Sequence, residues 1–167
     1  SRLSILFCLI VLPASSSLHG AGKVWVGINN GLHGEDIKVL AINPSTPQTI
    51  YAGSEQNGVY KSTDGGGNWT AVNTGLTFKY IRSLAINPSS PQTIYAGTDG
   101  QGVFKSTDAG GNWTATNTGS GVRWVRSQAI DPSTPQTMYA GTSGGVFKST
   151  DAGGNWTATA LASPEVW

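Results

Sequence analysis

Short segments of β-branched and aromatic residues alternating with polar ones recur along the chain, separated by turns rich in glycine, proline and asparagine. In the middle of the chain these segments are residues 81–86, 93–98, 102–106 and 113–118. Each is five or six residues long, and period-two alternation over that length predicts a strand rather than a helix. Two prolines between the first two segments exclude a helix there and indicate a tight turn.

This four-strand unit is repeated along the chain. Residues 37–80 align with residues 81–124 without a gap, and 29 of the 44 positions are identical. Residues 125–167 form the same unit with one deletion, and residues 23–36 match the end of a further unit. Four strands in about 44 residues is the period of a propeller blade. We therefore predict an all-β fold of three four-stranded antiparallel blades, plus one extra N-terminal strand at Lys23–Asn29.

Between the third and fourth predicted strands, each unit carries almost the same eight residues. We call these segments, residues 62–69, 106–113 and 149–156, the aspartate turns. Within such a turn an aspartate can accept backbone amides, a serine can bond back across the turn, and a glycine can take a positive φ. A tryptophan at the end can bury a large face between blades. The positions are Ser62, Asp64, Gly66 and Trp69; Ser106, Asp108, Gly110 and Trp113; and Ser149, Asp151, Gly153 and Trp156.

The aspartate turns are similar to the Asp-box, S-x-D-x-G-x-x-W, of the bacterial neuraminidase repeat. The resemblance covers residues 25–167 and is strongest to xyloglucanase-like glycosidases and photosystem II assembly factors, with sortilin-type receptors also similar. It implies a β-propeller in which this motif serves folding, on the face opposite the usual ligand site. The competing role of these aspartates, in metal binding or acid catalysis, is the one we disfavour.

The same resemblance gives thin support for catalysis. Sialidases use an arginine triad and an Arg-Ile-Pro element, which this sequence lacks. Xyloglucanase-like enzymes place paired aspartates across a cleft between two large propellers, which a chain of 167 residues cannot build alone. We therefore lean toward a protein that is not an enzyme, with no catalytic residue, metal site or cofactor.

A candidate ligand face follows from the positions that vary between units. The loops at 54–58, 98–102 and 142–145, together with the links between units, differ while the remaining sequence is nearly constant. Aromatic residues there can stack on sugar rings, and cations at one repeat position, shared with Lys38, can hold a carboxylate or sulfate. The candidates are Tyr80, Trp124, Arg82, Arg126 and Asp99. The competing interpretation, which we favour, is solvated strand ends with aromatics packed between blades.

The charge balance and the N-terminal residues restrict the possible partners and the cellular location. Lysine and arginine total 10 and aspartate and glutamate 9, which argues against a nucleic-acid partner bound through a basic surface. Residues 1–22 combine Arg2, an apolar run at residues 5–12 and small residues, which is typical of a secretory signal peptide. The run is too short to span a membrane. We expect a secreted, extracellular or periplasmic protein; the alternative is an apolar N-terminal arm buried as a strand.

Three blades do not close a ring, since propellers normally have four to eight. Exposed apolar flanks must then be covered, either by copies of this chain or by the rest of a longer propeller. The strand at 23–29 has no blade of its own and can add to a neighbour's open edge. We predict a secreted, non-catalytic module that acts in binding or self-assembly. The alternatives are a fragment of a carbohydrate-active hydrolase or a lectin-like propeller that binds polysaccharide.

Overall fold

The computed structural model describes residues 27–32, 35–116 and 121–160. These residues contain twelve strands: β1 (Ile37–Ile42), β2 (Ile50–Ser54), β3 (Val59–Ser62), β4 (Thr70–Ala71), β5 (Ile81–Ile86), β6 (Ile94–Thr98), β7 (Val103–Ser106), β8 (Thr114–Ala115), β9 (Val125–Ile130), β10 (Met138–Thr142), β11 (Gly145–Ser149) and β12 (Thr157–Ala158). A search of these ranges finds no helix long and apolar enough to cross a membrane.

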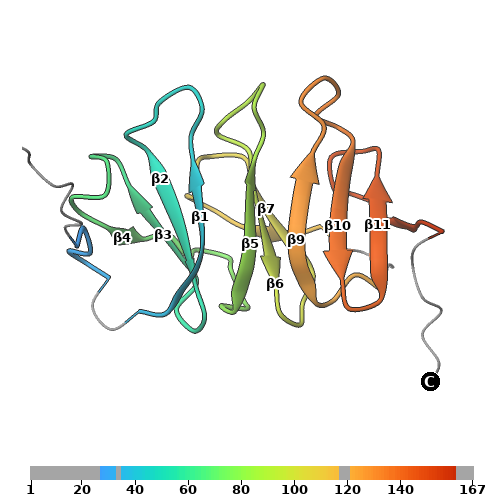
Figure 1. The fold of residues 1–167 in the computed structure, drawn as a ribbon, viewed down its shortest axis with the longest axis horizontal. Helices are drawn as coiled ribbons and strands as arrows, with labels where there is room; N and C mark the ends of the chain where they lie inside the picture. The colour runs from blue at the N-terminus through green and yellow to red at the C-terminus, as the bar shows by residue number, and fades with distance from the viewer. Residues whose placement is uncertain (1–26, 33–34, 117–120, 161–167) are drawn as a thin grey trace, which may run out of the picture.

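The strands form three separate antiparallel sheets, each following the order of the chain. Their strand orders are β1-β2-β3-β4, β5-β6-β7-β8 and β9-β10-β11-β12. The sheets stand side by side, with β1, β5 and β9 as neighbouring innermost strands (Figure 1). We call them blades 1, 2 and 3. The described sheets do not close on one another, so blade 1 and blade 3 each present one face without a neighbouring blade.

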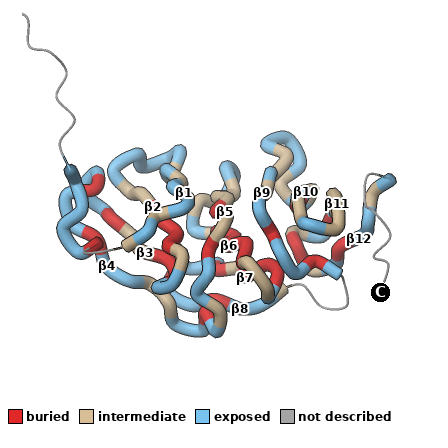
Figure 2. Tube along the Cα trace, turned by 60° about the horizontal axis from the view of Figure 1, so that its bottom comes forward, coloured by how far each residue is buried: buried red, intermediate tan, exposed pale blue. Residues whose placement is uncertain are grey.

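Most of the core lies at the two junctions between blades, where each face of the blade 2 sheet packs on a neighbouring blade, and a smaller cluster of Leu32, Ala52 and Trp69 lies where residues 28–32 cover blade 1. The cluster between blades 1 and 2 includes Tyr51 from β2, Phe104 from β7 and Trp113. The cluster between blades 2 and 3 includes Tyr95 from β6 and Met138 from β10. Burial is accordingly concentrated along the two junctions in the middle of the row (Figure 2). The apolar residues predicted to alternate along each strand therefore serve the two blade junctions.

Each junction is also held by a tyrosine and a lysine that reach the next aspartate turn. The Tyr51 hydroxyl donates to the Ala109 carbonyl at 3.1 Å, and the Lys61 ammonium donates to the same oxygen at 3.2 Å. At the second junction Tyr95 and Lys105 donate to the Ala152 carbonyl at 3.1 and 3.4 Å. The repeating structural unit is therefore a blade together with the tyrosine and lysine that donate hydrogen bonds to the aspartate turn of the next blade.

The fourth strands are shorter than predicted. Residues 113–118 were expected as one strand, whereas β8 covers only Thr114–Ala115. At its start, the Trp113 amide donates to the Thr74 carbonyl of blade 1 at 2.9 Å and not to β7, whereas the Thr116 amide after β8 still donates to the Val103 carbonyl of β7 at 2.9 Å. The start of this outer strand is therefore set by a bond to the neighbouring blade.

The N-terminal predictions fall mostly outside the described residues. The signal peptide or apolar arm at 1–22, and residues 23–26 of the expected extra strand, lie there. The described part of that strand, residues 27–29, has no strand assignment. Residues 28–32 nevertheless lie against blade 1, where the Ile28 carbonyl accepts the Trp69 indole N–H at 2.9 Å. We call residues 27–32 the flank.

Candidate functional site

The three aspartate turns share one set of hydrogen bonds. In blade 2 the Asp108 carboxylate accepts the Asn112 backbone amide at 2.8 Å, the Asn112 side-chain amide at 2.8 Å and the Ser106 hydroxyl at 2.8 Å. The Ser106 oxygen in turn accepts the Gly110 amide at 2.9 Å, and Gly110 has a φ of +90°. The turns at Asp64 and Asp151 have the same bonds. The carboxylates thus stabilise the turns that the preceding blade contacts.

These hydrogen bonds favour the charged form of each carboxyl group. The side-chain and backbone N–H groups of Asn68 lower the pKa of Asp64 to about 2 from 3.8, and Asn112 does the same for Asp108. The pKa of Asp151 is lowered to about 2 by the Asn155 backbone amide and side chain. The aspartates are thus anionic throughout the neutral range and cannot serve as proton donors there.

The lowered pKa values predict acid sensitivity with a defined sign. Because the folded-state pKa lies below the unfolded-state value, the stabilisation is complete above about pH 4 and is lost as pH falls toward 2. We expect the free energy of unfolding to be flat between pH 5 and 7 and to fall below pH 4. Asp108→Asn should be less stable than the wild type at pH 6 and should lose less on going to pH 2. Urea unfolding across this range measures both, and parallel pH profiles for the two proteins would contradict this role.

The varying loops and links meet on one face, opposite the aspartate turns along each blade. The Gly58 amide of the first loop donates to the Lys79 carbonyl of a link at 3.1 Å. In the next blade, Gly102 donates to the Arg123 carbonyl at 2.9 Å, and Asp99 forms a backbone bridge with Trp124. In blades 1 and 2 the loop is therefore held by the link that leads into the next blade.

The innermost strands place cations in a hollow of about 370 Å³ on this face. The second residues of β1, β5 and β9 are Lys38, Arg82 and Arg126, and all three line the hollow together with Asp99. The residues thus come together as the repeat alignment indicates, one cation from each blade.

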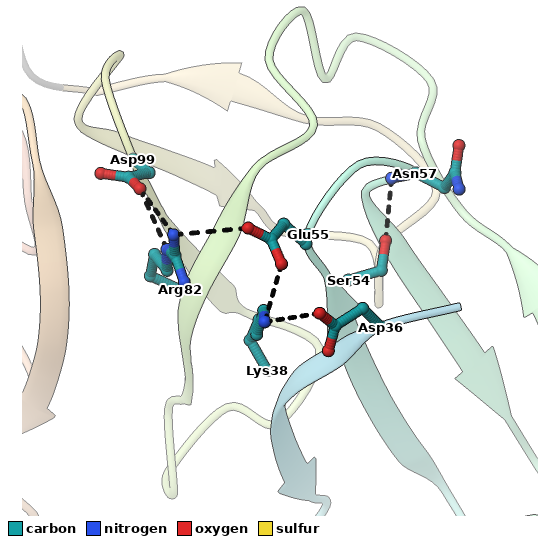
Figure 3. A network of polar contacts seen from close by, with 7 residues as sticks. All are labelled: Asp36, Lys38, Ser54, Glu55, Asn57, Arg82 and Asp99. Atoms are coloured by element: carbon teal, nitrogen blue, oxygen red, sulfur yellow. Dashed lines mark hydrogen bonds and ion pairs between the residues drawn. The ribbon is translucent and has the colours of Figure 1, made fainter. Parts of the chain in front are cut away.

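Carboxylates interleave with these cations to form a ladder (Figure 3). Lys38 pairs with Asp36 at 2.6 Å and with Glu55 at 2.7 Å. Arg82 lies 3.7 Å from Glu55, and its Nε and Nη2 donate to one Asp99 oxygen at 3.0 and 2.9 Å. The pKa of Asp36 is lowered chiefly by the Lys38 ammonium. Two of the three cations are thus already matched by acids.

Arg126 differs from its two repeat equivalents. Among the described residues, no carboxylate forms an ion pair with it. The acid position of its own blade is Ser143, in the loop that is one residue shorter, and Asp99 is engaged by Arg82. Arg126 is therefore the cation of the hollow that no described carboxylate pairs with, so its charge is available to bind an anion.

The aromatic candidates are partly exposed on the same side. Tyr80 is 37% and Trp124 42% exposed, and the Tyr80 carbonyl accepts the Asp99 amide at 3.0 Å. The Tyr80 ring also lies 6.0 Å from that of Phe78. Within the described ranges no group of three His, Cys, Asp or Glu side chains is arranged to hold a metal ion.

Sequence reasoning missed the ladder itself. Glu55 and Asp36 were not among the predicted site residues, although Glu55 occupies the same repeat position as Asp99. In blades 1 and 2, the loop carries an acid at this position and the innermost strand carries a cation near its start. This shared pattern is the signal from which the pairing could have been predicted. Glu35 was not considered, and it accepts the Tyr60 hydroxyl at 2.8 Å and the Asn57 amide at 2.8 Å.

The two outer faces of the row expose residues whose repeat equivalents are buried. Tyr139 in β10 corresponds to Tyr51 and Tyr95; these two are fully buried, whereas Tyr139 is 38% exposed. On blade 1, Leu40 and Ile42 in β1 are 61% and 58% exposed, whereas Leu84, the equivalent of Leu40, packs between blades. The blade 3 face and the blade 1 face are therefore the two halves of a junction of the kind formed inside the chain.

Comparison with solved structures gives the fold. The chain is similar to part of an ancestral GH74 enzyme, with 27% identity and a TM-score of 0.60 over 74% of this chain. It is also similar to the GH74 enzyme of Niastella koreensis, with 25% identity and a TM-score of 0.61 over 73% of this chain, and to YCF48 bound to D1 peptide, with 15% identity and a TM-score of 0.60 over 74%. The blades are β-propeller blades. The predicted fold class is thereby confirmed.

The propeller chain described here is shorter than these proteins. It covers 18% of the ancestral GH74 enzyme, 22% of the Niastella enzyme and 40% of YCF48. No family model matches it, and no curated protein matches it. Activities and partners of the larger proteins therefore belong to those proteins, and the similarity establishes the blade architecture.

Proposed function

We propose that this chain is a non-catalytic interaction module, joined to further propeller blades through its two outer faces. The observation that carries the proposal is the state of Tyr139. Its equivalents Tyr51 and Tyr95 are buried and donate to the aspartate turn of the next blade, while Tyr139 is exposed beside Lys148 with the same pair of donors. A following blade would satisfy both groups.

The chemistry of the aspartate turns and of the ladder supports a role without catalysis. The carboxylates of the aspartate turns accept hydrogen bonds within the turns, and those of the ladder are paired with Lys38 and Arg82. General acid catalysis near neutral pH needs a carboxyl group with a raised pKa, and the shifts found for Asp36, Asp64, Asp108, Asp131 and Asp151 are all downward. Assignment of the turns to the Asp-box repeat, and export directed by residues 1–22, are parts of this proposal; N-terminal sequencing of exported protein would locate the cleavage.

The experiment is the mass of the purified chain in solution, measured by light scattering over a hundredfold range of concentration. We expect a folded species whose mass exceeds that of one chain and rises with concentration. A well-folded monomer at all concentrations would overturn the proposal.

A second candidate is a glycan-binding module or a fragment of a glycoside hydrolase. The observations that favour it are the 27% identity to a GH74 enzyme and the hollow in which Arg126 has charge to spare, on the same face as Tyr80 and Trp124. Charged polysaccharides would pair with the cation and present sugar rings to the aromatics.

For this second candidate we expect measurable retention on an acidic polysaccharide in affinity electrophoresis. Trp124→Ala and Arg126→Ala should each weaken it by about tenfold, the loss of one stacked ring or one charge-assisted hydrogen bond. Arg126→Lys, which keeps the charge, is the matched control. No retention, or equal retention by all variants, would remove the glycan-binding role, and xyloglucan hydrolysis would overturn the non-catalytic one.

A further inference from the structure

The outer strand of blade 1 makes contacts with two sheets. Its first residues pair with the third strand, with Thr70 opposite Lys61 and Ala71 opposite Tyr60. Its next residues cover the following blade: the Val72 carbonyl accepts the Trp113 indole N–H at 2.8 Å. Any strand that closes a junction between blades must therefore serve two sheets at once.

An asparagine fastens this outer segment to its own blade. The Asn73 side-chain oxygen accepts the Val59 amide at 2.7 Å, and its amide donates to the Asn57 carbonyl at 2.8 Å. In blade 3 the same repeat position is Ala160, which offers neither group. The chain's own last outer segment therefore lacks the side chain that anchors its equivalent.

A glycine lets the segment pass closely over the next blade. A Cβ at Gly75 would lie 2.3 Å from the Trp113 carbonyl oxygen, and a Cβ at Gly31 would lie 2.2 Å from the Trp69 carbonyl oxygen. These contacts leave no room for a side chain. In the third unit the equivalent residue is Ala162. An alanine at this repeat position would place its Cβ where Gly75 and Gly31 have no room for one.

The flank has both residues that the C-terminal segment lacks. Asn29 and Gly31 stand at the positions of Asn73 and Gly75, and the flank already performs the covering task on blade 1. The Asn30 carbonyl accepts the Trp69 amide at 2.9 Å, as the Thr74 carbonyl accepts that of Trp113. By repeat alignment, the flank should also pair with the third strand of a preceding blade. No such strand is present among the described residues.

We propose that two copies of this chain join head to tail by strand exchange, the flank of one copy becoming the outer strand of blade 3 of the other. Repeat alignment sets the proposed register: Gly27 corresponds to Ala71, whose partner Tyr60 corresponds to Phe147, and the preceding Val26 corresponds to Thr70, whose partner Lys61 corresponds to Lys148. This inference rests on the proposed function. Tyr139 and Lys148 then donate to the Gly65 carbonyl across the junction, as Tyr51 and Lys61 donate to that of Ala109 inside the chain.

The strand displaced by this exchange is short and exposed. β12 pairs with β11 through Thr157 and Ala158, which are both solvent-exposed, and Thr159 adds bonds from its backbone amide and its hydroxyl to the Val146 carbonyl, each at 2.9 Å. The incoming strand can restore the backbone pairs, whereas the bond from the Thr159 hydroxyl to the Val146 carbonyl is lost, because Ile28 stands at the repeat position of Thr159. Burial of Tyr139 against Leu40 and Ile42 then favours the joined state, since apolar surface leaves water.

A pair of double-cysteine variants distinguishes exchanged from unexchanged strands. Both are made in a Cys8→Ala background, because Cys8 is the one natural cysteine. Lys148→Cys is combined either with Val26→Cys or with Thr157→Cys, which faces Lys148 within one copy. Directly opposed residues of an antiparallel pair have Cα atoms about 4.5–5.5 Å apart, which a disulfide accepts. The Lys148→Cys single variant reports random collision.

After oxidation, we expect Val26→Cys/Lys148→Cys to run as dimers or a longer ladder on a non-reducing gel, at least fivefold above the single variant. Thr157→Cys/Lys148→Cys should remain one chain in the gel and lose assembly in solution. If the wild type assembles but only the 148–157 link forms, strand exchange is wrong and the proposed function stands. If the wild type is monomeric, the proposed function itself fails.

Discussion

Replacing Trp113 by alanine is expected to lower the free energy of unfolding by about 3–5 kcal/mol. The indole is 3% exposed, packs in the cluster between blades 1 and 2, and donates its N–H to the Val72 carbonyl at 2.8 Å. Its removal leaves a cavity at a blade junction and an unsatisfied carbonyl. Urea unfolding followed by circular dichroism measures the loss.

Trp124→Ala is the matched control for this prediction. The Trp124 side chain is 42% exposed and belongs to a link, so its loss should cost less than about 1 kcal/mol. Phenylalanine variants separate the hydrogen bond from the packing. Trp113→Phe loses a hydrogen bond, whereas the Trp156 N–H is buried without a partner and Trp156→Phe loses none. Equal costs at positions 113 and 124 would contradict the assignment of the core to the blade junctions.

Replacing Tyr139 by aspartate is expected to abolish assembly without destabilising the fold. The side chain is 38% exposed on the blade 3 face, so an isolated chain loses little packing. In a joined pair the same position would bury an unpaired charge, which is costly. We expect light scattering to give the mass of one chain at concentrations where the wild type is larger, with an unchanged urea midpoint.

Tyr80→Asp is the matched control for Tyr139→Asp. Tyr80 has nearly the same exposure, 37%, but lies in a link on the candidate ligand face, away from both outer faces. It should assemble like the wild type. If both variants dissociate, the effect comes from added charge in general and the blade 3 face has no special role.

The repeat made most of the fold predictable, because identical segments must form the same local structure. The positions of β5, β6 and β7 were predicted to within one residue of the observed bounds. The start of the fourth strand was not, since the Trp113 amide bonds to the Thr74 carbonyl of another blade. Periodicity within one segment carries no information about that long-range partner.

For the candidate sites, too, the sequence predicted the features that repeat and not those that depend on contacts between blades. One repeat position placed Lys38, Arg82 and Arg126 around one hollow, since equivalent residues occupy equivalent places in adjacent blades. Their charge balance could not be read from that position alone. It depends on Glu55 and Asp99, which come from a loop facing the strand starts of two blades. The exposure of the Tyr139 side chain likewise becomes visible only when its burial is compared with that of its repeat equivalents, Tyr51 and Tyr95.

The most direct test of head-to-tail joining is the mass of a mixture of two face variants. Tyr139→Asp disables the blade 3 face and Leu40→Asp the blade 1 face, so each variant alone should be monomeric. Mixed in equal amounts, they retain one intact face of each kind and should form a dimer of one copy of each that grows no further with concentration. Contradiction would come from a mixture that stays monomeric while the wild type assembles, or from a Leu40→Asp variant that still dimerises with itself.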